Sequence, residues 1–492
     1  MLMVSLFLVF ITAACIIFIV IFKWIFQYWH RKKLPFLKPQ IPFGNYPNFF
    51  KSKENLGMET AQLYAQMKKK GWKHGGIYIL TFPIYMFVHL DYLKNVVEDD
   101  GHFCDRLLVG NPKVEPLHAH LMNLKGTQWR YMRTKLSPGF TSGKTKMMFD
   151  IIKQCQDCLV KKVENLGCVE VEELCKNFTT DVIGSCAFGL DCKSMENEIS
   201  PFKIYTRRAL PTTTLISRLK LTFFSNFPRF GSFLNIRTID KDVHDFFMNL
   251  VHEVIEYREK NGDSRNDFIQ SLIEIKKSGS LTVEDIAAQT FVFFLAGLET
   301  SALLMAWTLY ELAKNLEIQE GLRDEICEVL EKFDGRICYQ SLQEMKYFDQ
   351  VMNETMRKFP PVPFVNRVCT KDYKIPEEDT IIEKGTAVVI PILGIHRDAD
   401  YYPDPEKFDP GRFSEENKKK MPSCAYIPFG KGPRSCIGMR LGLLQAKVGL
   451  CGLVRNFRFT LNEKTPDVMR LNPGSLFSSP EGGIWLDVEK CL

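Results

Sequence analysis

The sequence predicts a mainly α-helical protein with a minor β-sheet region, preceded by a single N-terminal transmembrane helix. Three observations carry this prediction: an uncharged apolar run at the N-terminus, helical patterning over most of residues 50–350, and short strand-like stretches that gather after residue 370. The 492 residues can bury a deep core, and 45% hydrophobic with 25% charged residues is typical of globular chains. A disordered or fibrous protein is therefore excluded.

The N-terminal run, residues 1–22, has no charge, and only Ser5 and Thr12 in it are polar. A helix of this length extends about 33 Å, and the hydrocarbon core of a bilayer is about 30 Å thick. A cleaved secretory signal would have a basic start, a shorter apolar run and a small-residue cleavage site. None of these features is evident, so we expect residues 1–22 to be a retained transmembrane anchor.

A basic and proline-rich linker, residues 23–49, follows the anchor. Its aromatic residues Trp24, Tyr28 and Trp29 suit the lipid headgroup layer, and a basic run at 31–33 comes next. Positive charge after the span predicts that the body, residues 50–492, faces the cytosol. Seven Lys and Arg precede the first acidic residue and exceed the net charge of +6, so the body is nearly neutral and no nucleic-acid partner is expected.

A long helix is predicted to begin at Thr282, whose hydroxyl can cap it and which two acids follow in the first turn. No proline and a single glycine occur from there to Asn315, and residues 291–298 are apolar on every side. We expect this helix to run through the core. A second membrane span is unfavourable because Glu299 would lie near the middle of the bilayer.

Strand patterns are short and mostly late in the chain. Residues 386–392 are the clearest, with shorter extended pieces at 373–382 and 484–486, and residues 75–88 form an earlier hairpin candidate. These stretches are few compared with the helical ones, so the sheet region is predicted to be minor.

Residues 428–438 carry the most informative motif. Glycine and proline dominate it, which predicts an ordered turn, and Cys436 lies at its end just before a helix that begins near Gly438. A helix N-terminus and the nearby Arg434 both lower the pKa of a thiol. Cys436 is therefore a candidate metal ligand or nucleophile, although it could also be one more buried thiol among 15 cysteines.

Two further groups of residues could support chemistry. Glu354 and Arg357 share a helix face that ends at once in Pro360 and Pro361. In the long helix, the glycine at 297 lets another group approach the backbone, and an acid and a hydroxyl beside it, Glu299 and Thr300, could carry protons.

Three other patterns are interpreted as structural. Residues 139–145 look like a phosphate-binding loop, but the spacing is one residue short and no strand precedes it. His118 and His120 have no third ligand in register. Cys155 and Cys158 lie in an amphipathic helical stretch without a second pair.

Taken together, the motifs closely resemble those of the cytochrome P450 superfamily, over the whole chain. The detailed amino-acid sequence of residues 136–142, 294–301 and 354–361 looks like that of the insect microsomal family-6 branch. The motifs that carry the resemblance, in chain order, are Trp129-x-x-x-Arg133, Ala296-Gly297-x-x-Thr300, Glu354-x-x-Arg357 and Phe429-x-x-Gly432-x-Arg434-x-Cys436-x-Gly438.

The resemblance implies a haem cofactor and a role for each matching residue. Cys436 would be the metal ligand, a thiolate on the haem iron. Thr300 and Glu299 match an acid–alcohol pair that protonates bound dioxygen. The remaining haem-binding positions would be Trp129, Arg133, Arg367, Arg434, Phe429, Gly438 and Ala296. Glu354, Arg357 and Arg412 would form a structural triad, and Phe291, Phe294, Phe364, Val365 and Phe477 would line the substrate pocket.

The function implied by the resemblance is a microsomal monooxygenase of the endoplasmic reticulum membrane. It would insert one oxygen atom from O2 into lipophilic substrates, with electrons from NADPH delivered by NADPH–cytochrome P450 reductase and with cytochrome b5 as an additional donor. The family-6 wording favours xenobiotic compounds such as insecticides or plant toxins. A hormone or lipid hydroxylase, and a haem-thiolate isomerase or dehydratase that needs no O2, are the alternatives. The apolar stretch Leu219–Phe233 is a further candidate for membrane contact.

Overall fold

A computed structural model of the chain describes most of its residues. They are 2–48, 53–99, 101–107, 110–196, 201–209, 214, 216, 217, 219, 220, 223, 227, 230, 233–235, 237–262, 265, 267–277, 279–376 and 378–491. The predicted membrane-contact stretch Leu219–Phe233 lies largely outside this set.

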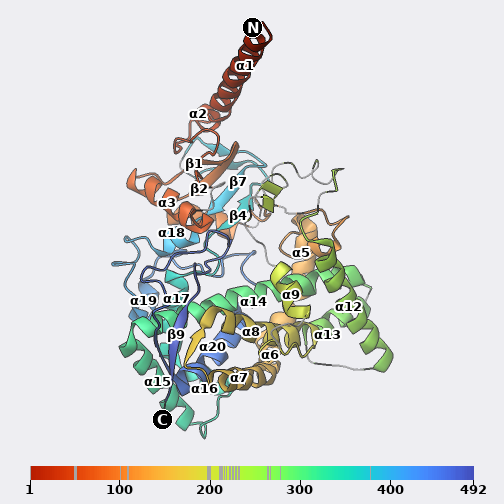
Figure 1. Ribbon diagram of the computed structural model, residues 1–492, viewed down its shortest axis with the longest axis vertical. Helices are drawn as coiled ribbons and strands as arrows, with labels where there is room; N and C mark the ends of the chain where they lie inside the picture. The colour runs from red at the N-terminus through yellow and green to blue at the C-terminus, as the bar shows by residue number, and fades with distance from the viewer. Residues whose placement is uncertain are drawn as a thin grey trace.

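The described chain is mainly helical, as the sequence predicts, and one long helix crosses its middle (Figure 1). The helices before that long helix are α1 Leu2–Ile25, α2 Tyr28–Arg31, α3 Leu56–Lys69, α4 Leu90–Glu98, η1 Pro116–His118, α5 Gly126–Leu136, η2 Ser137–Phe140, α6 Ser142–Met147, α7 Phe149–Val163, α8 Val171–Ile183, η3 Gly184–Phe188, α9 Pro201–Ala209, α12 Lys241–Asn261 and α13 Phe268–Lys277. The long helix is α14 Val283–Lys314, and after it come α15 Leu316–Glu331, α16 Tyr339–Glu344, α17 Lys346–Lys358, α18 Ile392–His396, η4 Pro410–Phe413, α19 Glu415–Lys420 and α20 Met439–Asn456.

Three small sheets complete the described fold. The four-stranded sheet has the order β1-β2-β7-β4, built from β1 His74–Ile79, β2 Phe82–Phe87, β7 Ala387–Ile390 and β4 Val365–Val368. The other two contain β3 Cys168–Glu170, β9 Trp485–Lys490 and β8 Phe457–Leu461, and β5 Tyr373–Lys374 paired with β6 Ile381–Ile382. The hairpin and the late strands predicted from the sequence are confirmed. The register brings Arg367 of β4 opposite Val388 of β7.

The helix α14 is the centre of the core, as predicted. Its first turn is closed by a capping box, in which Thr282 and Asp285 satisfy each other's backbone N–H groups. Of the two described helices that are long and apolar enough to cross a membrane, α14 is mostly buried inside the body. It is therefore a core helix, in agreement with the apolar pattern on all its sides.

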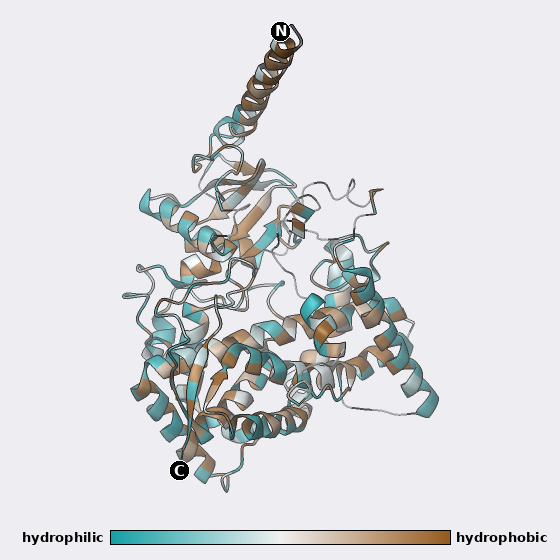
Figure 2. Ribbon diagram, viewed as in Figure 1, coloured by the Kyte–Doolittle hydropathy of each residue, from teal (hydrophilic) through white to brown (hydrophobic). Residues whose placement is uncertain are grey.

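The other such helix is α1, which projects away from the body and is apolar along most of its length (Figures 1 and 2). One of the aromatic residues expected in the lipid headgroup layer lies elsewhere. Trp24 is 66% exposed, but Trp29 is only 2% exposed and donates from Nε1 to the carbonyl of Ile77 on β1 at 3.1 Å. A Cβ on Gly76 would lie 2.3 Å from the Trp29 ring, so the indole fits only against glycine. Trp29 thus belongs to the core of the body.

These two tryptophans provide a direct stability test. We expect Trp29→Ala to lower the free energy of unfolding by about 3–5 kcal/mol, because it leaves a large cavity against β1. Trp24→Ala, the matched control, changes it by less than about 0.5 kcal/mol. Denaturant unfolding of the full chain in detergent measures both. Equal effects of the two substitutions would show that Trp29 is not part of the core.

Candidate functional site

The turn that holds Cys436 is fixed by its own backbone. The N–H of Cys436 donates to the carbonyl of Phe429 at 2.9 Å, and the N–H of Ser435 donates to that of Gly432 at 3.0 Å. Gly432 has a φ of 73°, and a Cβ there would lie 2.0 Å from the carbonyl oxygen of Val97. Only glycine fits this position. The turn leads through Gly438 into α20, so Cys436 lies just before a helix N-terminus, as predicted.

The Cys436 thiol lies in a desolvated setting, although the residue keeps accessible surface. Desolvation by the surrounding protein raises the pKa of the thiol. The N–H of Gly438 and the guanidinium groups of Arg106 and Arg133 act in the opposite direction and favour the thiolate.

Four guanidinium groups converge beside this thiol, and we call them the arginine cluster: Arg106, Arg133, Arg367 and Arg434. They come from the loop after α4, from α5, from β4 and from the cysteine turn. Burial is the largest cause that lowers the pKa of each, and repulsion from Arg106 lowers the pKa of Arg367 and Arg434 further, to about 9. Among the described residues, only the Asp105 carboxylate forms an ion pair with the cluster, 3.6 Å from Arg434.

Uncharged partners hold these side chains in place without neutralising them. Arg434 donates to the carbonyls of Leu121 at 3.2 Å and Leu124 at 2.8 Å, and its guanidinium lies 4.0 Å from the centre of the Trp129 ring. Arg133 donates to the carbonyl of Ser435 at 3.0 Å. The Nε of Arg106 is buried and has no hydrogen-bond partner in the described structure. Desolvated positive charge of this kind is costly unless an anion is bound, and a ligand with two carboxylates fits it.

The long helix forms another wall of the site. Ala296 is exposed although Phe294 and Leu298 beside it are buried. The hydroxyl of Thr300, one turn later, donates to the carbonyl of Ala296 at 2.7 Å. Gln445 of α20 donates to the carbonyl of Gly297 at 2.9 Å and so fixes this stretch of α14.

The predicted triad is assembled in the structure. Glu354 and Arg357 are both fully buried and form a bidentate pair with N–O distances of 2.7 and 2.8 Å. Arg412 lies 3.5 Å from the same carboxylate and donates to the carbonyls of Pro403 and Asp404. The triad therefore ties α17 to the irregular chain that precedes the cysteine turn.

The predicted pocket residues separate into two groups. Phe364, Val365 and Phe477 are half-buried, as side chains that line an internal space would be. Phe294 is fully buried, and its ring lies 5.0 Å from Phe202 and 5.6 Å from Phe188. Phe291 is likewise buried, with its ring 5.0 Å from Phe247. These two rings fill the packing between α14, α9 and α12, where the sequence prediction had placed them on an open pocket wall.

The sequence analysis interpreted three patterns as structural, and none of them forms a metal site among the described residues. No group of three metal-ligating side chains occurs in the part of the chain that the structure describes. His118 contacts Thr238 and Glu115, Cys155 and Cys158 are free thiols on α7, and residues 139–145 lie in η2 and α6. The element directly before them is the helix α5, and no described strand leads into this loop.

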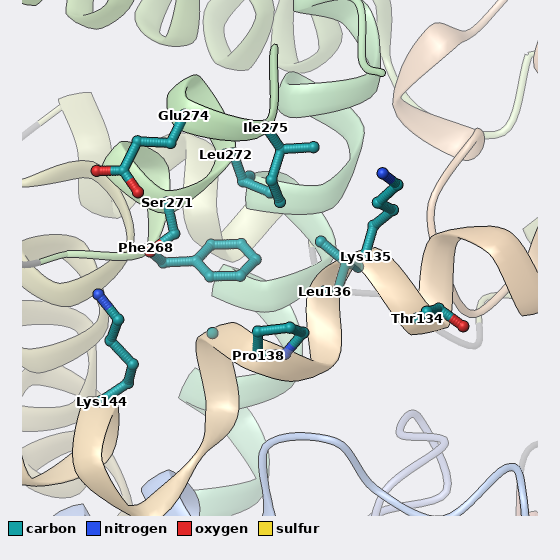
Figure 3. Close-up of a pocket in the computed structure, with 11 residues that line it drawn as sticks. Thr134, Lys135, Leu136, Pro138, Lys144, Phe268, Ser271, Leu272, Glu274 and Ile275 are labelled. Carbon is teal, nitrogen blue, oxygen red and sulfur yellow. The ribbon is translucent and has the colours of Figure 1, made fainter. Parts of the chain in front are cut away.

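A separate surface cavity of about 410 Å³ lies between α5, η2, α6 and α13. Figure 3 shows Phe268 extending across it from α13, with Lys135 and Lys144 on its border. None of the predicted site residues lines this cavity, so it is distinct from the cysteine site.

Sequence reasoning missed three residues that shape the site. Arg106 is an isolated arginine in a loop, and Gln445 lies inside a helical pattern, so neither carries a local signal. His396 accepts a hydrogen bond from the N–H of Ile427 at 2.9 Å through Nε2, and its Nδ1 lies 3.3 Å from the carbonyl of Met356. It thereby links α17 to the chain entering the cysteine turn.

Comparison with known proteins now identifies the family. The sequence model of the cytochrome P450 family matches residues 37–486, so the chain belongs to this family. It is 41% identical over 496 residues to probable cytochrome P450 6a14 of Drosophila melanogaster, covering 95% of this chain and 96% of that protein. It is 39% identical to cytochrome P450 6a2 of the same species, over 485 residues covering 94% and 96%. It is 38% identical to cytochrome P450 6A1 of Musca domestica, over 483 residues covering 95% and 94%.

Family membership defines the class of enzyme and its cofactor. The chain is a cytochrome P450 monooxygenase, an oxidoreductase, and its cofactor is a haem with a cysteine thiolate ligand. The relatives are insect family-6 proteins, which confirms the branch that the sequence wording indicated. The chemistry of the site residues fits a haem, because a thiol lies beside desolvated arginines that only one described carboxylate pairs with, and haem would supply two propionate carboxylates.

His396 makes the support of the cysteine turn sensitive to acid. Burial lowers the pKa of His396 to about 3, from 6.5 for an ordinary imidazole. Between pH 6.5 and about 3, His396 is therefore protonated in the unfolded chain but neutral in the folded chain. The free energy of unfolding decreases as pH falls through this range. We expect His396→Gln to reduce this loss by about 1.4 kcal/mol per pH unit.

Denaturant unfolding over a pH series measures the effect, as the difference in slope between wild type and variant. His30→Gln, at an exposed histidine of α2, is the control and keeps the wild-type slope. An unchanged slope in His396→Gln would mean that His396 is not held neutral in the fold.

Proposed function

We propose that this chain is a membrane-bound monooxygenase that oxidises lipophilic foreign compounds, using electrons from NADPH delivered by NADPH–cytochrome P450 reductase. The main support is the arginine cluster beside the Cys436 thiol, just before helix α20, which contacts α14 through the hydrogen bond from Gln445 to Gly297. These residues offer anion-binding guanidinium groups and a metal ligand, and α14 adds the Thr300 hydroxyl as a candidate proton donor. The insect family-6 relatives support foreign compounds as substrates.

In this proposal Cys436 is the haem ligand. The bound haem supplies the redox chemistry that activates O2, and a thiolate ligand favours cleavage of the O–O bond. Arg106, Arg133, Arg367 and Arg434 hold the propionates, with Trp129 supporting Arg434. Cys491 has none of this setting, since its N–H extends the backbone pairing to Asn456 after β9.

Thr300 and Glu299 hold and move the protons that oxygen chemistry needs. The Thr300 hydroxyl is positioned by the carbonyl of Ala296, and the neighbouring Glu299 is a buried acid. A hydroxyl that donates to a backbone carbonyl can exchange that proton for another donor without leaving its place. The presence of this pair favours a monooxygenase over an isomerase or dehydratase, which would need no proton delivery to O2.

The apolar helix α1 supports attachment to the endoplasmic reticulum membrane, with the catalytic body on the cytosolic side. Its Val4–Ile25 stretch is long enough to span the hydrocarbon core. The described aromatic residues Phe227, Phe230 and Phe233 are about half exposed or more and add apolar surface for lipid contact.

The surface near the cysteine turn suits an acidic electron donor such as the reductase or cytochrome b5. Arg130 and Arg440 are exposed there, and Lys431 is half-buried and paired with Glu98 at 2.7 Å. Lys447 of α20 is buried and paired with Asp349 of α17. Docking would therefore rely on the arginines and not on Lys447.

The ligand assignment gives a spectroscopic prediction. We expect Cys436→Ala to lose the red-shifted Soret band that a thiolate-ligated haem shows after reduction and CO binding, because the variant has no thiolate beside the iron. Cys491→Ala, the matched control, keeps that band. If Cys436→Ala retained it, the ligand would have to be another residue.

The catalytic proposal is tested by turnover with purified reductase, NADPH and a panel of lipophilic plant toxins, insecticides and steroid hormones. We expect oxygenated products, dependent on both reductase and NADPH, with the foreign compounds turned over faster than the hormones. Rearrangement or dehydration without O2 consumption would favour the isomerase alternative. A strong preference for a hormone would move the substrate class to endogenous compounds.

A further inference from the structure

The acid next to Thr300 is the inner end of a short chain of ionisable side chains. Glu299 is 4% exposed, and its Oε1 lies 3.2 Å from the Nζ of Lys176 on α8. The same oxygen accepts a long hydrogen bond from the hydroxyl of Ser479 at 3.4 Å. The second carboxylate oxygen, Oε2, is buried and has no hydrogen-bond partner in the described structure. One oxygen of Glu299 is therefore engaged and the other is unpaired in the described structure.

The chain continues from Lys176 toward solvent. Glu172 lies one turn earlier on α8, with its Oε1 2.7 Å from the same Nζ of Lys176. The side chain of Glu172 is 12% exposed and that of Lys176 is 27% exposed, compared with 5% for Glu299. Accessibility thus falls from α8 to α14, and a single ammonium group bridges the two carboxylates.

The electrostatic setting brings the pKa of one carboxyl group close to neutral pH. The pKa of Glu172 is raised to about 7, because burial outweighs the opposing effect of Lys176 and the carboxylates of Glu299 and Glu170 act in the same direction as burial. Burial alone would lower the pKa of Lys176, but its two carboxylate neighbours raise it above the ordinary value. Glu170 faces the same region and caps α8 by accepting from the N–H groups of Glu172 and Glu173. The Cys175 thiol also faces these carboxylates, and burial raises its pKa.

We infer that Glu172 and Lys176 form a proton-uptake path that leads from solvent at α8 to Glu299 and so to the Thr300 side of α14. The inference rests on the proposed monooxygenase function, in which Thr300 and Glu299 deliver protons. Lys176 and Glu172 are positioning and relay residues, because both lie on α8 and act only through Glu299.

The transfer balances without a further reactant. In one concerted step Lys176 passes an ammonium proton to Glu299 and receives one from Glu172, and Glu172 then takes up a proton from bulk solvent. Glu172 and Lys176 have then recovered their charges, and Glu299 recovers its own when it passes the proton on. Glu299 passes its proton onward from the oxygen that has no other partner.

The competing interpretation is a static ion pair that only clamps α8 to α14. The chain contains a matched pair of that kind, in which Lys358 of α17 lies 2.9 Å from Glu311 farther along α14, with side-chain exposures of 9% and 1%. Removing either lysine leaves a buried carboxylate unpaired, so both removals destabilise the fold. Only the Lys176 pair lies beside Thr300.

Lys176→Arg separates the two interpretations. Arginine keeps a positive charge and can pair with both carboxylates, but it does not release its proton at accessible pH. A clamp survives this substitution, whereas a relay is blocked. The assay uses the haem-loaded full chain with reductase, NADPH and a substrate identified by the panel. We expect Lys176→Arg, Lys176→Met and Glu172→Gln each to lower the product formed per NADPH about threefold or more. Peroxide release should rise by a matching amount, and the solvent isotope effect should become larger. We expect Lys358→Met to leave this ratio unchanged.

A second readout does not depend on turnover. Infrared titration of the resting protein is expected to show a carboxyl group that protonates near pH 7, absent in Glu172→Gln and shifted to higher pH in Lys176→Met. Wild-type coupling in Lys176→Arg, or the absence of a carboxyl group titrating in this range, would overturn the relay. If the wild-type protein forms no oxygenated product although the carboxyl group titrates as described, the proposed function itself fails and the relay role fails with it.

Discussion

The desolvated positive charge of the arginine cluster is the constraint on which the rest of the site depends. Arg106, Arg133, Arg367 and Arg434 repel one another, and Asp105 is the one carboxylate paired with them among the described residues. Such an arrangement is costly for an isolated chain and becomes favourable once an anion is bound. The cluster also joins the two parts of the fold, because Arg367 comes from the four-stranded sheet and Arg133 from the helical part. In the proposed site, the carboxylates of the cofactor would therefore also join these two parts of the fold.

The helix α14 combines the core of the fold with one wall of the site. Most of its side chains are buried against neighbouring helices, and Gly297 allows close approach, since a Cβ there would lie 2.8 Å from Ile183 of α8. Ala296 and Thr300 lie one turn apart on one face of α14, whereas Glu299 is directed to Lys176 on α8. The same close packing of α8 on α14 that stabilises the core thus brings a solvent-accessible lysine next to a buried acid.

Much of the fold and the centre of the site could be predicted from the sequence because their signals are local. The cap at Thr282 and the uninterrupted apolar pattern predicted α14, and the glycine-rich turn before a helix singled out Cys436. Glu354 and Arg357 share a helix face by their spacing alone, and the two prolines after them mark its end. These features depend on neighbours in the chain, which a single sequence displays.

The features that could not be predicted depend on long-range contacts. Arg106 is important because three arginines from distant segments meet it, and Trp29 is buried because Gly76 on β1 leaves room for its ring. Phe294 was expected on the pocket wall because of its helix, but tertiary packing turns its ring toward Phe188 and Phe202. The relay pair on α8 has the common spacing of a surface ion pair, and only its contact with Glu299 gives it a functional interpretation.

The most direct test of this account compares how tightly the apoprotein binds haem and haem dimethyl ester, in which both propionates are esterified. If the arginine cluster is satisfied by carboxylates, haem should bind at least about a hundredfold more tightly, since loss of a desolvated charge partner costs about 3–5 kcal/mol. The ratio should shrink in Arg106→Leu, which removes part of the unpaired charge. Equal affinity for the two haems in the wild-type protein would contradict the account, because the cluster would then need no anion.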